Sequence, residues 1–156
     1  MPVPGFLQYP VVIFIVHYCS YHKIYSMKTS FKPAGYNSVS PYFIIKDAEQ
    51  FVQLMTAIFD AGLLRKYNRP DGSIMHAELK LYDSVIMLAE ATEQYPPVPM
   101  VLHVYVQDLD TVFTRAKEAG CKVLEEPKQR EGDPDRRATF MDFGGNMWSV
   151  GTQLAV

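Results

Sequence analysis

The chain has 156 residues, of which 48% are hydrophobic and 21% charged, and its formal net charge at pH 7 is −2. This length suits one domain, or two small modules that share a core, and it is sufficient to bury an interior. The near-balanced charge gives no support to nucleic-acid binding or to a role at a membrane surface. Cys19 and Cys121 lack metal-binding or redox spacing, so we expect reduced thiols in a cytoplasmic protein.

The first 35 residues differ in character from the rest. An apolar run at residues 6–19 contains Pro10 and is shorter than the roughly 20 apolar residues of a transmembrane helix. It also lacks the basic region and the small-residue cleavage site of a signal peptide. Met27 resembles a natural start. We therefore expect residues 1–35 to be a dispensable extension, with an extra strand, a partner-binding tail or a mis-assigned upstream start as the alternatives.

The body of the chain opens with a strand and a helix. Residues 42–47 (YFIIKD) alternate apolar and polar side chains, which is typical of a strand. Asp47 can cap the next helix, with Gln50 in the position of a capping box. Gly62 is expected to end this helix. The helix itself is predicted from apolar residues at helical spacing, namely Phe51, Leu54, Met55 and Phe59.

The same pattern recurs 61 positions later, where residues 103–108 (HVYVQD) correspond to 42–47. Here Asp108 is the capping residue, Gly120 ends the helix, and the apolar stripe consists of Leu109, Val112, Phe113 and Ala116. Each helix is followed by a strand, at 63–67 and at 121–125, and then by a polar loop and a hairpin. The order β-α-β-β-β therefore occurs twice, which indicates a duplicated supersecondary unit.

The first hairpin, at residues 72–90, has two different faces. With Tyr82 and Asp83 at the turn, Leu81 pairs with Ser84 and Glu78 with Met87. One face suits a core, because it carries Leu79, Leu81, Ser84, Ile86 and Leu88. The other face is mixed and is expected to line a cavity or meet solvent; it carries His76, Glu78, Lys80, Val85, Met87 and Ala89. The second hairpin is expected at 137–142 and 147–152.

These modules and four short phrases carry a family resemblance. The phrases are SVSPYF at 38–43, MHAEL at 75–79, DSVIML at 83–88 and DFGGNMW at 142–148. The chain resembles the glyoxalase / bleomycin-resistance / extradiol-dioxygenase (vicinal oxygen chelate) superfamily, and within it an uncharacterised glyoxalase-like branch. The resemblance covers roughly residues 36–153 and implies an α+β fold. Two βαβββ modules, at about 36–95 and 96–153, would form a curved, mostly antiparallel eight-stranded sheet around a central cup, with the helices outside.

The resemblance also implies a site and an assembly. Enzymes of the superfamily mostly bind a divalent metal at four positions, which correspond here to Ser40, Met87, Val101 and Ser149. None of these is His, Asp or Glu, and a divalent metal site needs several such ligands. Glyoxalase I or extradiol dioxygenase chemistry is therefore not expected, and no cofactor is predicted. Many members of the superfamily are homodimers, so a homodimer is expected here as well.

A second group of residues offers an alternative chemistry. His76, Glu78 and His103 can face the same cup, where they would make an acid/base group or an alternative divalent metal site. The structural alternative is that they hydrogen-bond one another and the backbone at the mouth of the cup. Tyr42 and Tyr105 can stack on a planar ligand or fill the cup. Trp148 is expected to point away from the cup, towards the second helix.

Two functions follow from these observations. The first is a metal-independent small-molecule-binding protein of the bleomycin-resistance type, and the second is a lyase or isomerase that uses His76, Glu78 and His103. In the charged loop that follows residue 127, Arg136 or Arg137 can hold an anionic ligand. No phosphate loop, dinucleotide fingerprint or nucleophile elbow is present. The residues expected to bind the ligand are Ser40, Tyr42, His76, Glu78, Met87, Val101, His103, Tyr105 and Ser149.

Overall fold

The computed structural model describes residues 31–154. The contacts divide the chain between Phe31 and Lys32, and the residues from Lys32 onwards form one compact unit. The predicted N-terminal extension therefore lies outside the described residues, apart from its last five. Within the described part of the chain, no helix is long and apolar enough to cross a membrane.

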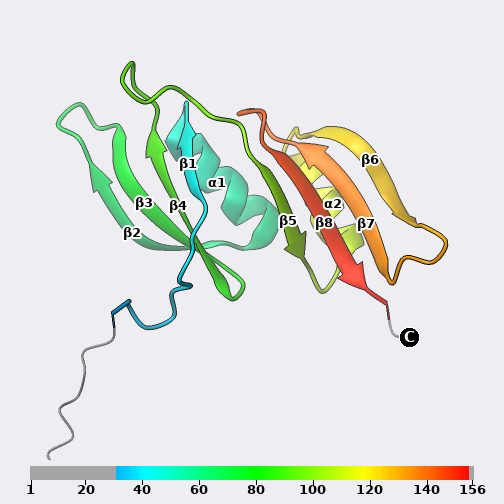
Figure 1. Ribbon diagram of the computed structural model, residues 1–156. Coiled ribbons are helices and arrows are strands. Elements are labelled where there is room, and N and C mark those ends of the chain that lie inside the picture. Colours follow the sequence, from blue (N-terminus) through cyan, green and yellow to red (C-terminus); the bar gives the residue numbers. More distant parts are fainter. Residues whose placement is uncertain (1–30, 155–156) are drawn as a thin grey trace, which may run out of the picture. The chain divides into compact units, whose positions relative to one another are not determined.

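The first module follows the predicted order (Figure 1). Its four strands form one sheet in the order β1-β4-β3-β2, with β1 parallel to β4 and the other pairs antiparallel. The β3–β4 hairpin has the predicted register, with Leu81 opposite Ser84 and Glu78 opposite Met87. The elements are β1 (Tyr42–Ile45), α1 (Ala48–Phe59), β2 (Gly62–Asn68), β3 (Ile74–Leu81) and β4 (Ser84–Glu90).

The second module repeats the first. Its sheet has the order β5-β8-β7-β6, again with a single parallel pair, between β5 and β8. The elements are β5 (Val101–Tyr105), α2 (Leu109–Glu118), β6 (Lys122–Gln129), β7 (Asp135–Met141) and β8 (Met147–Gln153). The predicted α+β fold of two βαβββ modules is thereby confirmed. The eight strands are divided between two separate four-stranded sheets.

Both helices cover the same side of the sheets, behind the strands in Figure 1. Helix α1 contacts β3 and β4, α2 contacts β6, β7 and β8, and the two helices contact each other. Each helix buries its apolar stripe in a core that both modules share. The opposite side of the sheets has no helix on it in the described part of the chain. We call this side the open face.

Trp148 ties the two modules together. It is fully buried, as predicted; it belongs to the same core cluster as the apolar stripe of α2, and its ring also packs on aromatic residues of the first module. The ring of Phe43 stacks on it with centroids 5.8 Å apart, and Phe51 and Phe59 of α1 lie 6.5 and 5.3 Å away. Its indole Nε1 donates to Asp142 Oδ2 at 2.9 Å, which satisfies the polar atom inside the core.

The two helices begin in different ways. Asp108 accepts a hydrogen bond from the backbone N of Thr111 at 3.0 Å, as the sequence predicts for a capping residue. Asp47 makes no side-chain cap and has a left-handed backbone conformation. The carboxylate of Glu90, at the end of β4, instead accepts from the backbone N atoms of Asp47 and Ala48, at 3.0 and 2.7 Å. Tertiary contact therefore replaces the predicted capping box.

The end of α1 also differs from the prediction. The helix stops at Phe59, and Asp60 adopts the left-handed conformation that closes it, with a φ of 56°. Gly62, which was expected to end the helix, is the first residue of β2. Asp can occupy the left-handed region because its short side chain is tolerated there.

Candidate functional site

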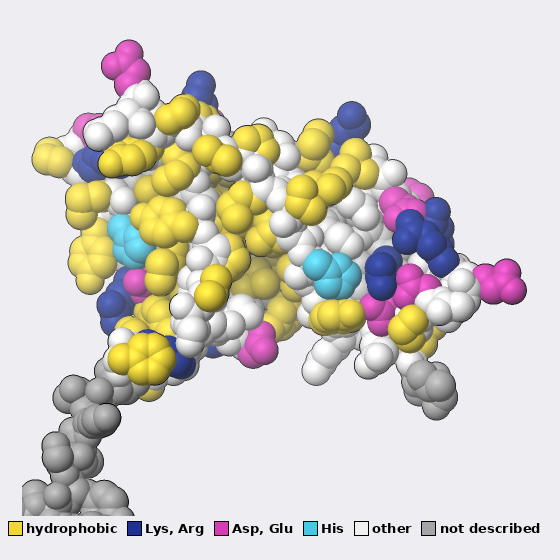
Figure 2. Space-filling model, viewed as in Figure 1, with side chains coloured by type: hydrophobic (Ala, Val, Ile, Leu, Met, Phe, Trp, Pro, Cys, Tyr) yellow, Lys and Arg dark blue, Asp and Glu magenta, His cyan; other side chains and the backbone are white. Residues whose placement is uncertain are grey.

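Strand alternation decides which side chains reach the open face. On β1, Phe43 and Ile45 are buried under the helices, whereas 43% of Tyr42 is exposed. On β5, Val101 and Tyr105 are 71% and 60% exposed. Figure 2 views the sheets from the open face and shows apolar side chains spread over both of them. The open face therefore combines aromatic and aliphatic surface with a few polar groups.

A chain of hydrogen bonds runs across the first sheet. The Tyr36 hydroxyl donates to Oε2 of Glu78, and Oε1 of Glu78 lies 3.1 Å from His76 Nε2. The other ring nitrogen of His76, Nδ1, lies 3.0 Å from the hydroxyl of Tyr42. Arg65 Nε lies 3.6 Å from Oε2 of the same glutamate. The structure thus brings three predicted site residues, Tyr42, His76 and Glu78, into one connected group, which we call the relay.

Glu78 is the buried end of the relay, with only 6% of its surface exposed. Burial by itself raises the pKa of this carboxyl, but hydrogen bonds from Tyr36 and His76 and the charge of Arg65 outweigh burial. The pKa of Glu78 consequently lies below its ordinary value, since partners that favour the charged form hold the proton off. At neutral pH the relay therefore contains an ionised carboxylate.

Aromatic rings enclose His76. The ring of Tyr67, on the neighbouring strand β2, stacks on the imidazole with centroids 6.4 Å apart, and the ring of Tyr42 lies 5.7 Å away. The Arg65 guanidinium lies over the Tyr36 ring, 5.7 Å from its centroid. Burial is the main cause that raises the pKa of Tyr42 above its ordinary value. The phenol of Tyr42 therefore remains protonated at neutral pH.

The segment before β1 lies against this end of the sheet. Lys80 Nζ donates to the backbone carbonyl of Gly35 at 2.9 Å, and Asn37 Nδ2 donates to Ser84 Oγ at 3.3 Å. Val85 is fully buried, although its strand position is on the open face opposite Lys80. The segment therefore covers part of the mixed face, which the sequence predicts to line a cavity or meet solvent.

His103 belongs to a separate group on the second sheet. Its Nδ1 lies 3.0 Å from the hydroxyl of Ser149, and its ring meets that of Tyr105 edge-on at 4.7 Å. The Tyr105 hydroxyl donates to Asp135 Oδ2 at 2.8 Å, and this hydrogen bond raises the pKa of the phenol. Arg137 Nη2 lies 3.2 Å from the carboxylates of both Asp133 and Asp135.

Gly151 provides room for this second group. A Cβ at this position would lie 3.2 Å from Cε1 of His103 and 3.5 Å from Cγ of Arg137. The two predicted anion-binding arginines already have acidic partners, because Arg136 also makes a two-pronged ion pair with Asp110 at 2.7 and 2.8 Å. Neither arginine therefore offers an uncompensated positive charge to a ligand.

The two groups occupy different sheets. Their strand positions place His76 and Glu78 on β3 and His103 on β5, and the histidine side chains in Figure 2 lie apart. Among the residues that the structure describes, no group of three or more His, Cys, Asp or Glu is arranged to hold a metal ion. The four family positions, Ser40, Met87, Val101 and Ser149, offer hydroxyl, thioether and alkyl groups, a set that does not fit a divalent cation.

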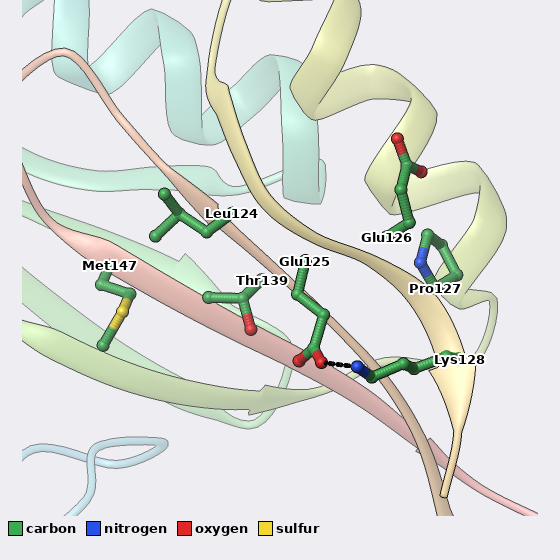
Figure 3. Close-up of a pocket in the computed structure, with 7 residues that line it drawn as sticks. All are labelled: Leu124, Glu125, Glu126, Pro127, Lys128, Thr139 and Met147. Carbon is green, nitrogen blue, oxygen red and sulfur yellow. Dashed lines mark ion pairs between the residues drawn. The ribbon is translucent and has the colours of Figure 1, made fainter.

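A hollow of about 920 Å³, whose lining includes Tyr82, Tyr105 and Thr152, borders the second group. Two smaller hollows lie nearby. One, of about 570 Å³, lies over β6–β8 and is shown in Figure 3, where Glu125 forms an ion pair with Lys128. Its lining residues are Leu124, Glu125, Glu126, Pro127, Lys128, Thr139 and Met147. The other, of about 320 Å³, lies where the β3–β4 turn meets β5, and His103 and Tyr105 are among its lining residues. His76 and Glu78 line neither hollow.

Sequence reasoning missed several partners of these groups. Tyr36, Arg65, Tyr67 and Asp135 are not among the site residues that the sequence predicts. Tyr67 has a usable signal, because strand pairing places it directly opposite His76. Tyr36 has no such signal, since a loop residue 42 positions away from Glu78 is brought there only by the tertiary fold.

Comparison with known proteins defines the class. The model of the Glyoxalase/Bleomycin resistance protein/Dioxygenase superfamily matches residues 36–150. The chain belongs to this superfamily, which confirms the resemblance. A curated relative, the uncharacterized protein Mb0911c of Mycobacterium bovis, is 28% identical over 125 residues, which cover 73% of this chain and 82% of the relative.

Solved structures share the fold at low identity. TioX from Micromonospora sp. ML1 is 21% identical with a TM-score of 0.61, and the match covers 77% of this chain and 98% of TioX. TnmS3, an antibiotic binding protein from Streptomyces sp. CB03234, is 19% identical with a TM-score of 0.59, covering 81% and 99%. The fosfomycin resistance protein FosX from Mesorhizobium loti is 18% identical with a TM-score of 0.56, covering 76% and 92%.

Proposed function

We propose that this chain is a metal-independent small-molecule-binding protein of the bleomycin-resistance type. The observation that carries the proposal is the open face, where the relay of Tyr42, His76 and Glu78 is surrounded by half-exposed aromatic rings. Ligand sites commonly combine such apolar surface with a few well-placed polar groups. The four family metal positions add no ligand for a divalent cation, which supports binding without a metal.

The remaining predicted ligand-binding residues complete this proposal. Ser40 and Met87 would contribute to the surface of the first sheet, and Val101, His103, Tyr105 and Ser149 to that of the second. The antibiotic-binding role of TnmS3 supports an antibiotic-like small molecule as the ligand. This support comes from a shared fold, and a fold by itself does not determine function.

A thermal-shift screen of metabolites and antibiotics tests the proposal, because a ligand that binds only the folded protein raises its melting temperature. Hits are then titrated by calorimetry against the wild type, Tyr67→Ala and, as the matched control, Glu118→Ala on the exposed side of α2. We expect Tyr67→Ala to weaken binding and Glu118→Ala to leave it unchanged. A screen without hits, or hits insensitive to substitutions on the open face, would contradict the proposal.

The relay favours one second candidate, a lyase or isomerase. A carboxylate, an imidazole and a phenol joined by hydrogen bonds can move a proton at a bound substrate, with Glu78 orienting His76. His103 would act from the second sheet, with or without a divalent metal. Turnover of a screening hit, followed by NMR and lost in His76→Asn, would favour this candidate over simple binding.

We further propose a homodimer in the cytoplasm. Exposed apolar and aromatic side chains on β5, such as Val101 and Tyr105, support an interface between two copies of the chain. Cys121 is a free thiol, the usual state of cysteine in a reducing compartment. Light scattering at several protein concentrations tests the dimer, since a constant monomer mass would contradict it. Cell fractionation tests the location, since recovery of the protein outside the cytoplasmic fraction would contradict it.

A further inference from the structure

The relay on the first sheet has a defined donor and acceptor order. It begins at Glu78, whose carboxylate receives the Tyr36 hydroxyl and lies beside Arg65. An ionised carboxylate can only accept hydrogen bonds. The short contact of 3.1 Å between Glu78 Oε1 and His76 Nε2 therefore requires a proton on Nε2.

The order continues through the imidazole. A neutral histidine carries one N–H, so a proton on Nε2 leaves Nδ1 as an acceptor. The Tyr42 hydroxyl is 3.0 Å from Nδ1 and must donate its proton there. The phenolic proton is thereby committed to His76, and the lone pairs of the oxygen remain available to the open face, where 43% of Tyr42 is exposed.

We propose that Tyr42 acts as a hydrogen-bond acceptor for the ligand, so that the site selects molecules presenting a hydroxyl or N–H donor beside a flat apolar body. This inference rests on the proposed function only in placing the ligand on the open face. The flat body would lie against the rings of Tyr42, His76 and Tyr67. The ring centroid of His76 is 5.7 Å from that of Tyr42 and 6.4 Å from that of Tyr67. A ligand group able only to accept would face the lone pairs of Tyr42 without a proton between them.

The second sheet lacks this fixed order. His103 Nδ1 meets the hydroxyl of Ser149, and a hydroxyl can either donate or accept. Within residues 31–154 the His103 ring makes no hydrogen bond to a carboxylate, so both tautomers are compatible with Ser149. We therefore attribute the preference for a donor-bearing ligand to Tyr42, His76 and Glu78 on the first sheet.

Substitution of Glu78 provides a reversal test. In Glu78→Gln, the Tyr36 hydroxyl and Arg65 are both donors and hold the amide oxygen on their side, which turns the NH₂ group towards His76. Nε2 must then accept, Nδ1 carries the proton and donates to the Tyr42 oxygen, and the phenolic proton turns outwards. This variant should present a donor in place of an acceptor. Glu49→Gln, a matched change at an exposed carboxylate on α1, should leave the order unchanged.

The first arm of the experiment needs no ligand. ¹⁵N NMR of the imidazole side chains distinguishes a protonated from an unprotonated ring nitrogen, and it is recorded from pH 6 to 9 to identify the neutral form. We expect His76 to carry its proton on Nε2 in the wild type and in Glu49→Gln, and on Nδ1 in Glu78→Gln. A wild-type proton on Nδ1 would overturn the inference and leave the proposed function intact.

The second arm uses two probes of almost the same shape. Naphthol carries a hydroxyl donor, whereas its methyl ether, methoxynaphthalene, can only accept. We expect naphthol to bind the wild type about fivefold more tightly, the ratio that one net hydrogen bond provides. The ratio should fall to about one in Tyr42→Phe, and also in Glu78→Gln, where the oxygens of both probes can accept from the Tyr42 hydroxyl.

The outcomes separate the two proposals. Equal affinity of the wild type for both probes would overturn the donor selection while preserving a small-molecule site. An absence of chemical-shift changes at Tyr42 and His76 up to the solubility limit of naphthol would also overturn it. If, in addition, no compound in the thermal-shift screen binds, the proposed function itself fails.

Discussion

The polar residues on the open face differ in how strongly they are tied into the fold. Glu78 is almost completely buried and contacts Tyr36, His76 and Arg65. His103 is exposed, and its ring is hydrogen-bonded to the hydroxyl of Ser149. Because the cost of removing a polar group follows the partners that it leaves unsatisfied, the two residues should respond differently to substitution.

His103→Asn should leave the fold almost unchanged, with the free energy of unfolding within about 0.5 kcal/mol of the wild type. If His103 contacts the ligand, the same variant should bind the screening hits more weakly. Denaturant unfolding and calorimetry on one preparation measure both quantities. A large loss of stability with unchanged ligand affinity would show that His103 is structural.

Glu78 should make stability depend on pH in the acid range. Its pKa is lowered in the folded protein, so the unfolded chain takes up a proton first as the pH falls. The stabilisation is therefore fully present above the ordinary glutamate range near pH 4.3 and is lost as the pH falls through the folded value. Unfolding free energies between pH 7 and pH 3 should decline less steeply in Glu78→Gln than in the wild type. Parallel declines would contradict this assignment.

At the scale of secondary-structure elements, the two modules use different contacts to perform the same local task. Asp108 caps α2 from its own chain segment, three residues before Thr111. Helix α1 receives its cap from Glu90, which is 42 residues beyond Ala48. The start of α1 is thus stabilised by the formation of the parallel β1–β4 pair, whereas the start of α2 is stabilised locally.

Glu90→Ala should therefore destabilise the protein by about 1–2 kcal/mol, in the upper range for loss of a helix cap, because two backbone N–H groups lose their acceptor. Asp47→Asn is the matched control, because the side chain of Asp47 makes no cap hydrogen bond. Asn also tolerates the left-handed backbone conformation at this position. Urea unfolding of both variants gives the comparison. Equal stability of Glu90→Ala and the wild type would mean that solvent replaces the cap at no cost.

At the scale of the whole molecule, metal content follows from the side chains that the fold presents. Protein purified without chelators should carry no stoichiometric metal and gain no stability from Ni²⁺, Zn²⁺, Fe²⁺ or Mn²⁺, because a metal bound only to the folded state would stabilise it. Elemental analysis and melting curves with each ion make the measurement. One equivalent of tightly held metal would identify His76, Glu78 and His103 as the residues to test as ligands.

The domain boundary yields a second test on this scale. We propose that residues 36–153 form the glyoxalase-like domain, with modules at about 36–95 and 96–153. A chain that begins at Met27 retains Gly35, Tyr36 and Asn37, which contact β3 and the β3–β4 turn. It should fold and melt within a few degrees of the full-length protein. Aggregation or a large fall in melting temperature would show that residues 1–26 belong to the core or to an interface.

The secondary-structure elements and their order follow from local patterns in the sequence. Strand alternation, apolar residues at helical spacing and a 61-residue repeat are local patterns, and burying them on one side of each element leaves few arrangements. The same reasoning predicted the register of the β3–β4 hairpin and the face on which Tyr42, His76, Glu78 and His103 lie. Those predictions depend on neighbours along the chain or across one tight turn.

The contacts between these side chains, in contrast, depend on the tertiary fold. Tyr36 reaches Glu78, Tyr42 reaches His76 across β4, and Glu90 caps α1, all over separations of more than 30 residues. His103 joins Ser149 and Tyr105 on the other sheet, apart from the relay. Such contacts depend on how loops cross a sheet and how strands pair at a distance. A periodic pattern carries no information on either, because its period specifies a face of an element and not the residue that lies opposite.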